Sequence, residues 1–391
     1  MAETTILDRR IDDELVGKLP LIRNAAQEQL LALQKTEFHP LEEGKNLIRR
    51  LIGRKLPPRD ILFWPTGMLM LGIAEADREG LYTPIYFKSV LENFRQAGGK
   101  LYYPDDVLSG AGVLKAWGSG ELSDDWEAVL HRMDEFLERT DRDEKGLIIY
   151  RPGRTNKEVI ADGIGMSAFF LAQYAEAFGD AAALEDALAQ LKGYRAAAKD
   201  PETGLLYHGY ECDADAALQM KGLLGWGRAM GWMMLGISEC AAASKDEELV
   251  RWLSQLGAFM KAHQKEDGLL PWTFTDRLGS GTVLTAAQRQ TFDGSFTDGE
   301  RHSDTSASAM IGYALLYGVS EGILPEEEYT EFFEKLTGGL LAVTDDKGNV
   351  GSSLAESAGF GLHPQNYTVN PWGQGAALSF LALADRQNEQ G

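Results

Sequence analysis

Apolar residues recur along the chain in six runs of helical length, each led by a short cluster of Gly with polar or aromatic residues. The runs are apolar on nearly every face and rich in Gly, Ala and Ser, which is typical of buried helices with close neighbours. They are FWPTGMLMLGIAEA from Phe63, PDDVLSGAGVLKAW from Pro104, ADGIGMSAFFLAQYAEAFGD from Ala161, WGRAMGWMMLGISECAAA from Trp226, SDTSASAMIGYALLYGVSEG from Ser303 and NPWGQGAALSFLALAD from Asn370. We therefore expect inner helices over 63–77, 106–117, 162–178, 228–242, 304–320 and 373–386.

Amphipathic segments alternate with these runs, mixing charged and apolar positions at helical spacing. They cover 12–34, 84–96, 124–139, 182–198, 246–263 and 325–341. Strand signals are sparse, and the best lie at 146–152 and 204–210. Alternating buried and amphipathic helices close into a ring with the buried set inside, so the pattern predicts an all-α fold, the (α/α)6 barrel or six-hairpin toroid. No linker or change of composition divides the chain, so we expect residues 1–391 to form a single domain.

Composition narrows the classes of partner. With 38 basic and 59 acidic residues, the 391-residue chain carries a net charge of -21, which argues against nucleic-acid binding and against anionic membranes. The two cysteines, Cys212 and Cys240, have no metal-like spacing, and no run is long enough to span a membrane. Because the first residues lack an apolar stretch of signal-peptide length, we expect a cytoplasmic protein.

The polar residues before each inner helix should all face one end of the ring. Six helix N-termini would present unpaired N–H groups there, which suits anionic groups. The loops leading into these helices, at 98–105, 146–161, 201–226 and 266–303, are long and rich in aromatic residues. Flat apolar faces and rigid polar groups are what sugar binding requires, so this end is the expected site.

Asp105, Asp106 and Asp162 stand at the starts of the second and third inner helices. Asp is a favoured N-cap, so a purely structural role is one interpretation. The other is catalysis, because Asp162 precedes Gly-Ile-Gly-Met, which opens space around it, and adjacent helices would bring Asp105 close. Paired carboxylates raise one another's pKa, so that one can act as an acid near neutral pH.

His208 and Arg228 are the other candidate polar groups. His208 could bind substrate or be a hydrogen-bonded core histidine. Arg228 lies in a nearly apolar stretch, so it must have an anionic or carbonyl partner, either a ligand carboxylate or a protein Asp or Glu. Four tryptophans lie in or beside the inner-helix starts: Trp64, Trp226, Trp232 and Trp372.

The chain has no phosphate-binding loop and no credible metal site, so no cofactor is expected. The acidic runs 141–144 and 246–248 are interpreted as solvated charge.

These motifs, with TGLLYHGYE and ESAGF, occur in the same order in the unsaturated glucuronyl and rhamnogalacturonyl hydrolases, glycoside hydrolase families 88 and 105, which the chain resembles over roughly residues 60–386. The resemblance implies an (α/α)6 barrel with a metal-free site that acts on Δ4,5-unsaturated uronic acids at the non-reducing ends of lyase-generated oligosaccharides. The implied chemistry is hydration: an aspartic acid protonates the vinyl ether, water adds to the adjacent carbon, and the resulting hemiketal opens and releases the sugar.

Residue roles follow from the same resemblance. Asp162 matches the acid/base aspartate in its Asp-Gly-x-x-Met setting, and Asp105, five residues before Gly110, matches the second essential aspartate. The substrate-contacting residues of the rhamnogalacturonyl branch match His208, Arg228 and Trp232. Two features depart from the family pattern. Trp64-Pro65-Thr66 stands where family members often carry a polar and aromatic pair before the first inner helix. The stretch after YHGYE is short, which implies an open pocket for the leaving sugar.

Two other classes of function stay open on the sequence. One is an ordinary glycosidase or a sugar epimerase on the same ring; a glycosidase needs two carboxylates at a defined separation and an epimerase typically needs paired histidines, for which His302 and His363 are the further candidates. The other is a non-catalytic oligosaccharide-binding protein, since fold alone does not imply activity. The presence of both Asp105 and Asp162 favours an enzyme over a binding protein. The following sugar, the linkage and the oligomeric state, including a homo-oligomer, stay open.

Overall fold

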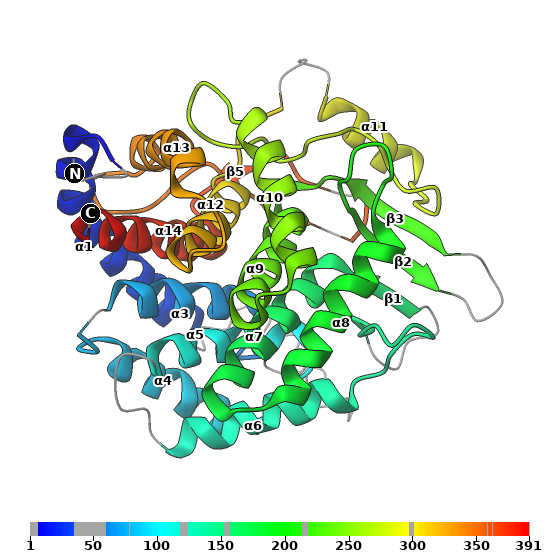
Figure 1. Ribbon diagram of the computed structural model, residues 1–391, viewed down its shortest axis with the longest axis horizontal. Coiled ribbons are helices and arrows are strands. Elements are labelled where there is room, and N and C mark those ends of the chain that lie inside the picture. Colours follow the sequence, from blue (N-terminus) through cyan, green and yellow to red (C-terminus); the bar gives the residue numbers. More distant parts are fainter. Residues whose placement is uncertain are drawn as a thin grey trace, which may run out of the picture.

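Six helices that are buried on nearly every face form the inner wall of a ring (Figure 1). The computed structural model describes residues 7–34, 60–77, 79–117, 124–151, 157–212, 218–296, 301–357, 359–361 and 363–390. In chain order the inner helices are α3 (Trp64–Ala76), α5 (Leu108–Trp117), α7 (Ala161–Phe178), α9 (Gly227–Ser244), α12 (Thr305–Ser320) and α14 (Pro371–Gln390). Each packs against the next, and α14 packs against α3, which closes the ring. The predicted (α/α)6 barrel is confirmed.

An outer layer of amphipathic helices covers this wall. It consists of α1 (Arg9–Gln34), α4 (Thr83–Gln96), α6 (Asp124–Arg139), α8 (Ala181–Ala198), α10 (Glu247–Ala262) and α13 (Thr330–Ala342). The last begins later than the predicted residue 325 because Pro325 leads into a short 3₁₀ turn, η2 (Glu326–Glu328). Helix α1 lies against α3 and α14, so the two ends of the described chain meet (Figure 1), and the Leu7 N–H donates to Asn388 Oδ1 at 3.3 Å.

Glycines set the spacing of the inner helices. A Cβ on Gly165 of α7 would lie 2.4 Å from the carbonyl oxygen of Trp232 on α9, and one on Gly375 of α14 would lie 2.3 Å from the carbonyl oxygen of Met68 on α3. These distances are far below van der Waals contact, so the backbones touch only because no side chain intervenes. The prediction that small residues allow close helix approach is confirmed.

A three-stranded antiparallel sheet lies beside α7 and α8. Its order is β1 (Lys157–Ile160), β2 (Tyr207–Cys212) and β3 (Gln219–Leu224), with Ile160 opposite Gly209. A second pair, β4 (Ser353–Leu354) with β5 (Tyr367–Thr368), precedes α14. The strand predicted at 204–210 is confirmed with a later start. A strand over 146–152 is wrong for the described residues there, because Ile148 only bridges back to Arg142 in a tight turn.

Two local features differ from expectation. The loop 266–303 contains a helix, α11 (Ala286–Gly294), which starts with a reciprocal capping box between Thr285 and Gln288. Asp143, interpreted as solvated charge, is buried, and it accepts hydrogen bonds from Tyr210 Oη at 2.7 Å and from the Leu147 N–H at 2.9 Å. Among the described residues, no helix is both long enough and apolar enough to cross a membrane.

Candidate active site

Asp162 lies in the first turn of α7, directly after strand β1. Because β1 pairs with β2, the sheet register brings His208 of β2 to this turn, and His208 Nε2 lies 3.2 Å from Asp162 Oδ2. The contact is close, but it lacks the alignment of a formed hydrogen bond, since Asp162 Oδ2 has no hydrogen-bond partner. His208 is 4% exposed, whereas the Asp162 side chain keeps 16% of its surface accessible. The Asp162 side chain is therefore partly accessible to a substrate, and the buried His208 ring lies against it.

Asp105 lies in η1 (Pro104–Val107), the 3₁₀ turn that leads into α5. It is buried, and its Oδ2 accepts a hydrogen bond from Tyr150 Oη at 2.5 Å while Oδ1 has no partner. Burial, together with the charges of Asp60 and Asp162, raises the pKa of Asp105 to about 7 against the lowering effect of the Tyr150 hydroxyl. Asp105 thus retains its proton near neutral pH, and the charge of Asp162 contributes to this.

Glycine makes room for this pair. A Cβ on Gly163 would lie 2.8 Å from the Tyr150 ring, so any side chain at 163 would push the tyrosine away from Asp105. The space expected from the glycines after Asp162 is filled at Gly163 by the ring of Tyr150.

Asp106 has a structural role. It is fully buried, and its Oδ2 accepts from the backbone N–H groups of Tyr102 at 2.6 Å and Tyr103 at 3.2 Å, which holds the turn before α5. Asp60, which was not predicted, lies beside it; burial raises the pKa of both carboxyls. Asp60, Asp105 and Asp106 thus lie close together, and their mutual repulsion favours protonated forms.

Arg228, in the first turn of α9, is 2% exposed. Its guanidinium donates to two backbone carbonyls in β4 and just after it, Leu354 at 2.7 Å and Ala355 at 2.9 Å. Burial lowers the pKa of Arg228, while the charges of Asp304, Asp162 and Glu356 oppose that effect. None of the carboxylates in the described part of the chain forms an ion pair with it, so the positive charge is hydrogen-bonded but not neutralised.

Two of the four predicted tryptophans lie against this arginine, and the other two extend the cluster. The Arg228 guanidinium lies 4.9 Å from the Trp226 ring centre and 5.5 Å from that of Trp372. Trp64 contacts Trp372 at 4.9 Å between ring centres and Trp232 edge-on at 6.0 Å. Trp232 is 1% exposed and lies behind the half-buried Trp64, so Trp64 is the more accessible ring.

All eight predicted site residues lie at one end of the ring, where the inner helices begin. Contacts run from Asp162 through His208, Trp226 and Arg228 to Trp372, Trp64 and Trp232, and Asp105 joins through its charge coupling to Asp162. The stretch after YHGYE, which bears on the pocket for the leaving sugar, includes 213–217, outside the described residues.

Sequence reasoning missed some neighbours of the site. Tyr150 and Phe360, whose ring lies 5.1 Å from His208, come from loops, where no periodicity points to a partner. His363, noted only as a candidate, is buried between Trp226 and Trp272; its two ring nitrogens have no hydrogen-bond partner, and burial lowers its pKa well below the usual value. Among the described residues, no group of three or more His, Cys, Asp or Glu could hold a metal ion.

Known proteins resemble this chain in sequence. The profile of Glycosyl Hydrolase Family 88 matches residues 50–387. The unsaturated rhamnogalacturonyl hydrolase YesR of Bacillus subtilis is 28% identical over 234 residues, which cover 57% of this chain and 58% of YesR. The alignment therefore spans less than two thirds of that relative's length.

Solved structures share the fold at low identity. A possible member of the GH105 family from Salmonella enterica superposes with a TM-score of 0.71 at 16% identity, covering 97% of this chain and 95% of that one. The unsaturated glucuronyl hydrolase of Bacillus sp. GL1 superposes with a TM-score of 0.66 at 17% identity, covering 95% and 96%. Since the family profile matches most of the chain and the ring carries the expected residues at one end, the protein belongs to glycosyl hydrolase family 88.

Proposed function

We propose that this protein hydrolyses oligosaccharides that carry a Δ4,5-unsaturated uronic acid at the non-reducing end. The observation that carries the proposal is the pair of Asp105, with a pKa raised to about 7, and the accessible Asp162 beside it. Protonating the carbon of an enol ether requires an acid that still holds its proton near neutral pH, and an interacting carboxyl pair meets that need.

In the proposed reaction Asp162 gives its proton to C4 of the double bond, and positive charge develops at C5 and the ring oxygen. Water adds to C5 while the Asp162 carboxylate takes one of its protons, which restores the acid. The product is a hemiketal that opens and releases the sugar. Asp105 keeps the shared proton on the pair and orients the substrate, and His208, behind Asp162, limits the positions that the carboxyl can adopt.

Arg228 supplies the proposed binding site for the uronate carboxylate. Its charge has no protein counter-ion in the described residues, although burying an unpaired charge is costly. A substrate carboxylate would complete the pairing, and the half-buried Trp64 supplies an apolar ring face for the sugar, packed against the buried rings of Trp232 and Trp372. The proposed reaction uses protein groups alone, without a metal or cofactor.

The substrate that we expect to react fastest is an unsaturated galacturonyl-rhamnose disaccharide. The motivation is the name of the relative from Bacillus subtilis, an unsaturated rhamnogalacturonyl hydrolase, together with the match of His208, Arg228 and Trp232 to that branch. Unsaturated glucuronyl disaccharides from other lyases are the comparison substrates.

The test follows the ultraviolet absorbance of the double bond, which disappears on hydration. The wild-type protein should discharge it, and Asp162→Asn should slow turnover by about 10²–10⁴-fold or more with the fold intact, because an amide cannot give up the proton. Near wild-type turnover by Asp162→Asn would exclude the proposed acid. Cleavage of the saturated disaccharide at the same rate would instead favour an ordinary glycosidase.

A further inference from the structure

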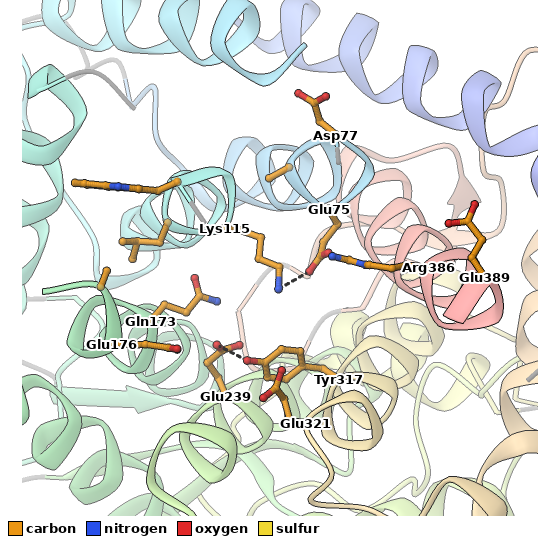
Figure 2. Close-up of a pocket in the computed structure, with 14 residues that line it drawn as sticks. Glu75, Asp77, Lys115, Gln173, Glu176, Glu239, Tyr317, Glu321, Arg386 and Glu389 are labelled. Carbon is orange, nitrogen blue, oxygen red and sulfur yellow. Dashed lines mark hydrogen bonds and ion pairs between the residues drawn. The ribbon is translucent and has the colours of Figure 1, made fainter. Parts of the chain in front are cut away.

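A cavity of about 760 Å³ lies at the opposite end of the ring from Asp105 and Asp162, where the inner helices end (Figure 2). Every inner helix contributes residues from its last turns. Figure 2 shows Glu75 of α3, Lys115 of α5, Gln173 of α7, Glu239 of α9, Tyr317 of α12 and Arg386 of α14 around one space. This chamber plays no part in the proposed hydrolysis, so its polar lining needs a separate explanation.

Acidic groups dominate the charge of the cavity. Six carboxylate residues and two basic residues line it: Glu75, Asp77, Glu176, Glu239, Glu321 and Glu389 against Lys115 and Arg386. The carbonyl ends of six helices point toward the same end of the ring, and each adds partial negative charge. The cavity therefore attracts cations.

Both basic residues are already engaged by one carboxylate. Lys115 Nζ lies 2.9 Å from Glu75 Oε1, and Arg386 pairs with Glu75 Oε2. Tyr313 Oη also donates to Glu75. Glu75 is fully buried, so removing either cation would leave its negative charge only partly compensated. An anionic ligand would have to compete with Glu75 for these cations, which disfavours it.

Glu239 is the unsatisfied group in this lining. It is 5% exposed; one oxygen accepts from Tyr317 Oη at 3.0 Å, and Oε2 has no hydrogen bond of ordinary geometry. Gln173 lies beside it, 8% exposed, and neither atom of its amide makes a hydrogen bond of ordinary geometry. Burial raises the pKa of Glu239 to about 7, although Lys115 opposes the shift. The Gln173 amide also opposes the shift, so the two groups interact with one another, and both side chains point into the cavity.

We propose that this cavity binds an organic cation of the diamine or polyamine class, with one ammonium group between Glu239 and Gln173. An ammonium group has three donors and no acceptor, which matches a carboxylate oxygen and an amide oxygen. A second ammonium would reach Glu176 and Glu321 at the rim, which are exposed.

The apolar part of the lining favours an organic cation over a metal ion. The space between the charged groups is lined by Ala74, Leu114, Trp117 and Ala177. The Tyr317 ring already makes a cation–π contact, since Lys115 Nζ lies 5.1 Å from its centre. No group of three metal-ligating side chains occurs among the described residues. A second hollow of about 530 Å³ shares Glu176, Tyr317 and Glu321 with the cavity, which provides room for an extended chain.

The test measures binding of spermidine to the full-length protein by titration calorimetry at pH 8 and constant ionic strength. Glu239→Gln and Glu327→Gln each remove one negative charge, but Glu327 is exposed on η2, outside the cavity. We expect saturable binding to the wild type and to Glu327→Gln, and at least tenfold weaker binding to Glu239→Gln. Glu176→Gln at the rim should weaken binding severalfold, which serves as the test if Glu239→Gln does not fold.

Three outcomes would overturn the proposal. One is no saturable binding by the wild type. Another is the same affinity for Glu239→Gln or Glu176→Gln as for Glu327→Gln, which would show only general attraction to an acidic protein. The third is displacement of spermidine by Mg²⁺ at equal charge concentration, which would show that charge alone, and not the ammonium geometry, decides binding. None of these measurements depends on hydrolytic activity.

Discussion

Asp105 keeps its proton into the neutral range because it is buried next to other acidic side chains. Asp162 differs from it by remaining accessible. The charge of Asp162 contributes to the raised pKa of Asp105, so the protonation of Asp105 depends on its neighbour. The pH dependence of the reaction should therefore report on the pair.

The first prediction concerns this pH dependence. The raised pKa of about 7 means that Asp105 loses its proton as the pH rises through that value, so kcat/KM should fall on the alkaline side. Asp105→Asn removes the carboxyl group with the raised pKa, so the alkaline limb should no longer lie near pH 7 and the rate should fall severely. The measurement is a pH profile with an unsaturated disaccharide. An unchanged limb in the variant would mean that Asp105 does not share the proton.

The second prediction concerns Arg228. Arg228→Ala should weaken substrate binding by about 2–4 kcal/mol, seen mainly as a rise in KM, if the guanidinium forms a desolvated ion pair with the substrate carboxylate. The variant should also lose stability, because the Ala355 carbonyl loses its donor and the Leu354 carbonyl keeps only the bond from Trp372 Nε1.

A control separates these two effects. Asn370 Nδ2 donates to the Ser353 carbonyl at 2.9 Å and so anchors the same strand without belonging to the proposed site. Asn370→Ala should lower stability with little change in KM. If both variants raise KM equally, the role of Arg228 is to anchor β4 and not to bind substrate.

At the scale of elements, inner-helix packing depends on contact between backbones. The helix pattern predicted all six inner helices because their apolar residues leave no polar face, which a buried helix requires. The pairing of Gly165 with the Trp232 backbone could not be predicted, because it depends on which turns of α7 and α9 lie opposite one another.

The third prediction tests that contact. Gly165→Ala should destabilise the protein by roughly 1–3 kcal/mol or more, because the added methyl group would overlap the Trp232 carbonyl and push α7 from α9. Gly17→Ala in α1 is the matched control: nothing lies within 4 Å of its Cβ position. There the substitution should stabilise by about 0.5–1 kcal/mol, since alanine favours a helix. Chemical denaturation of both variants gives the comparison, and equal effects would contradict the packing argument.

At the scale of the whole molecule, a buried ionic network joins the first and last parts of the ring. Glu75 of α3 contacts Lys115 of α5, Tyr313 of α12 and Arg386 of α14. These partners lower the pKa of Glu75 despite its burial. A carboxyl with a lowered pKa stabilises the folded state above its unfolded value, near 4.5, and this contribution is lost as the pH falls through the folded pKa.

The fourth prediction follows from this network. Lys115→Met should destabilise the fold by roughly 3–5 kcal/mol at pH 7, because it leaves Glu75 buried with one cation fewer. The loss should shrink at a pH low enough to protonate Glu75. Lys335→Met breaks an exposed pair with Glu331 on α13 and should cost less than about 1 kcal/mol. Denaturation curves at pH 7 and pH 4 test both, and a pH-independent loss would show that packing, not charge, is responsible.

The sequence by itself determined the architecture and the composition of the site. Alternating buried and amphipathic helices can be read from residue spacing, because burial on all faces or on one face leaves a local record. For the same reason Asp105, Asp162, His208, Arg228 and the four tryptophans could be assigned to one end of the ring before their positions were known. The order of motifs along the chain then pointed to a family.

Tertiary structure alone decided how those residues interact. The hydrogen bond from Tyr150 to Asp105, the anchoring of Arg228 on the backbone after Ser353, and the place of Trp232 behind Trp64 join loops and helices that are far apart in sequence. The cavity around Glu239 likewise exists only where six helix ends converge. A pKa or an unsatisfied buried group depends on distances in space, and residue spacing along the chain does not record those distances.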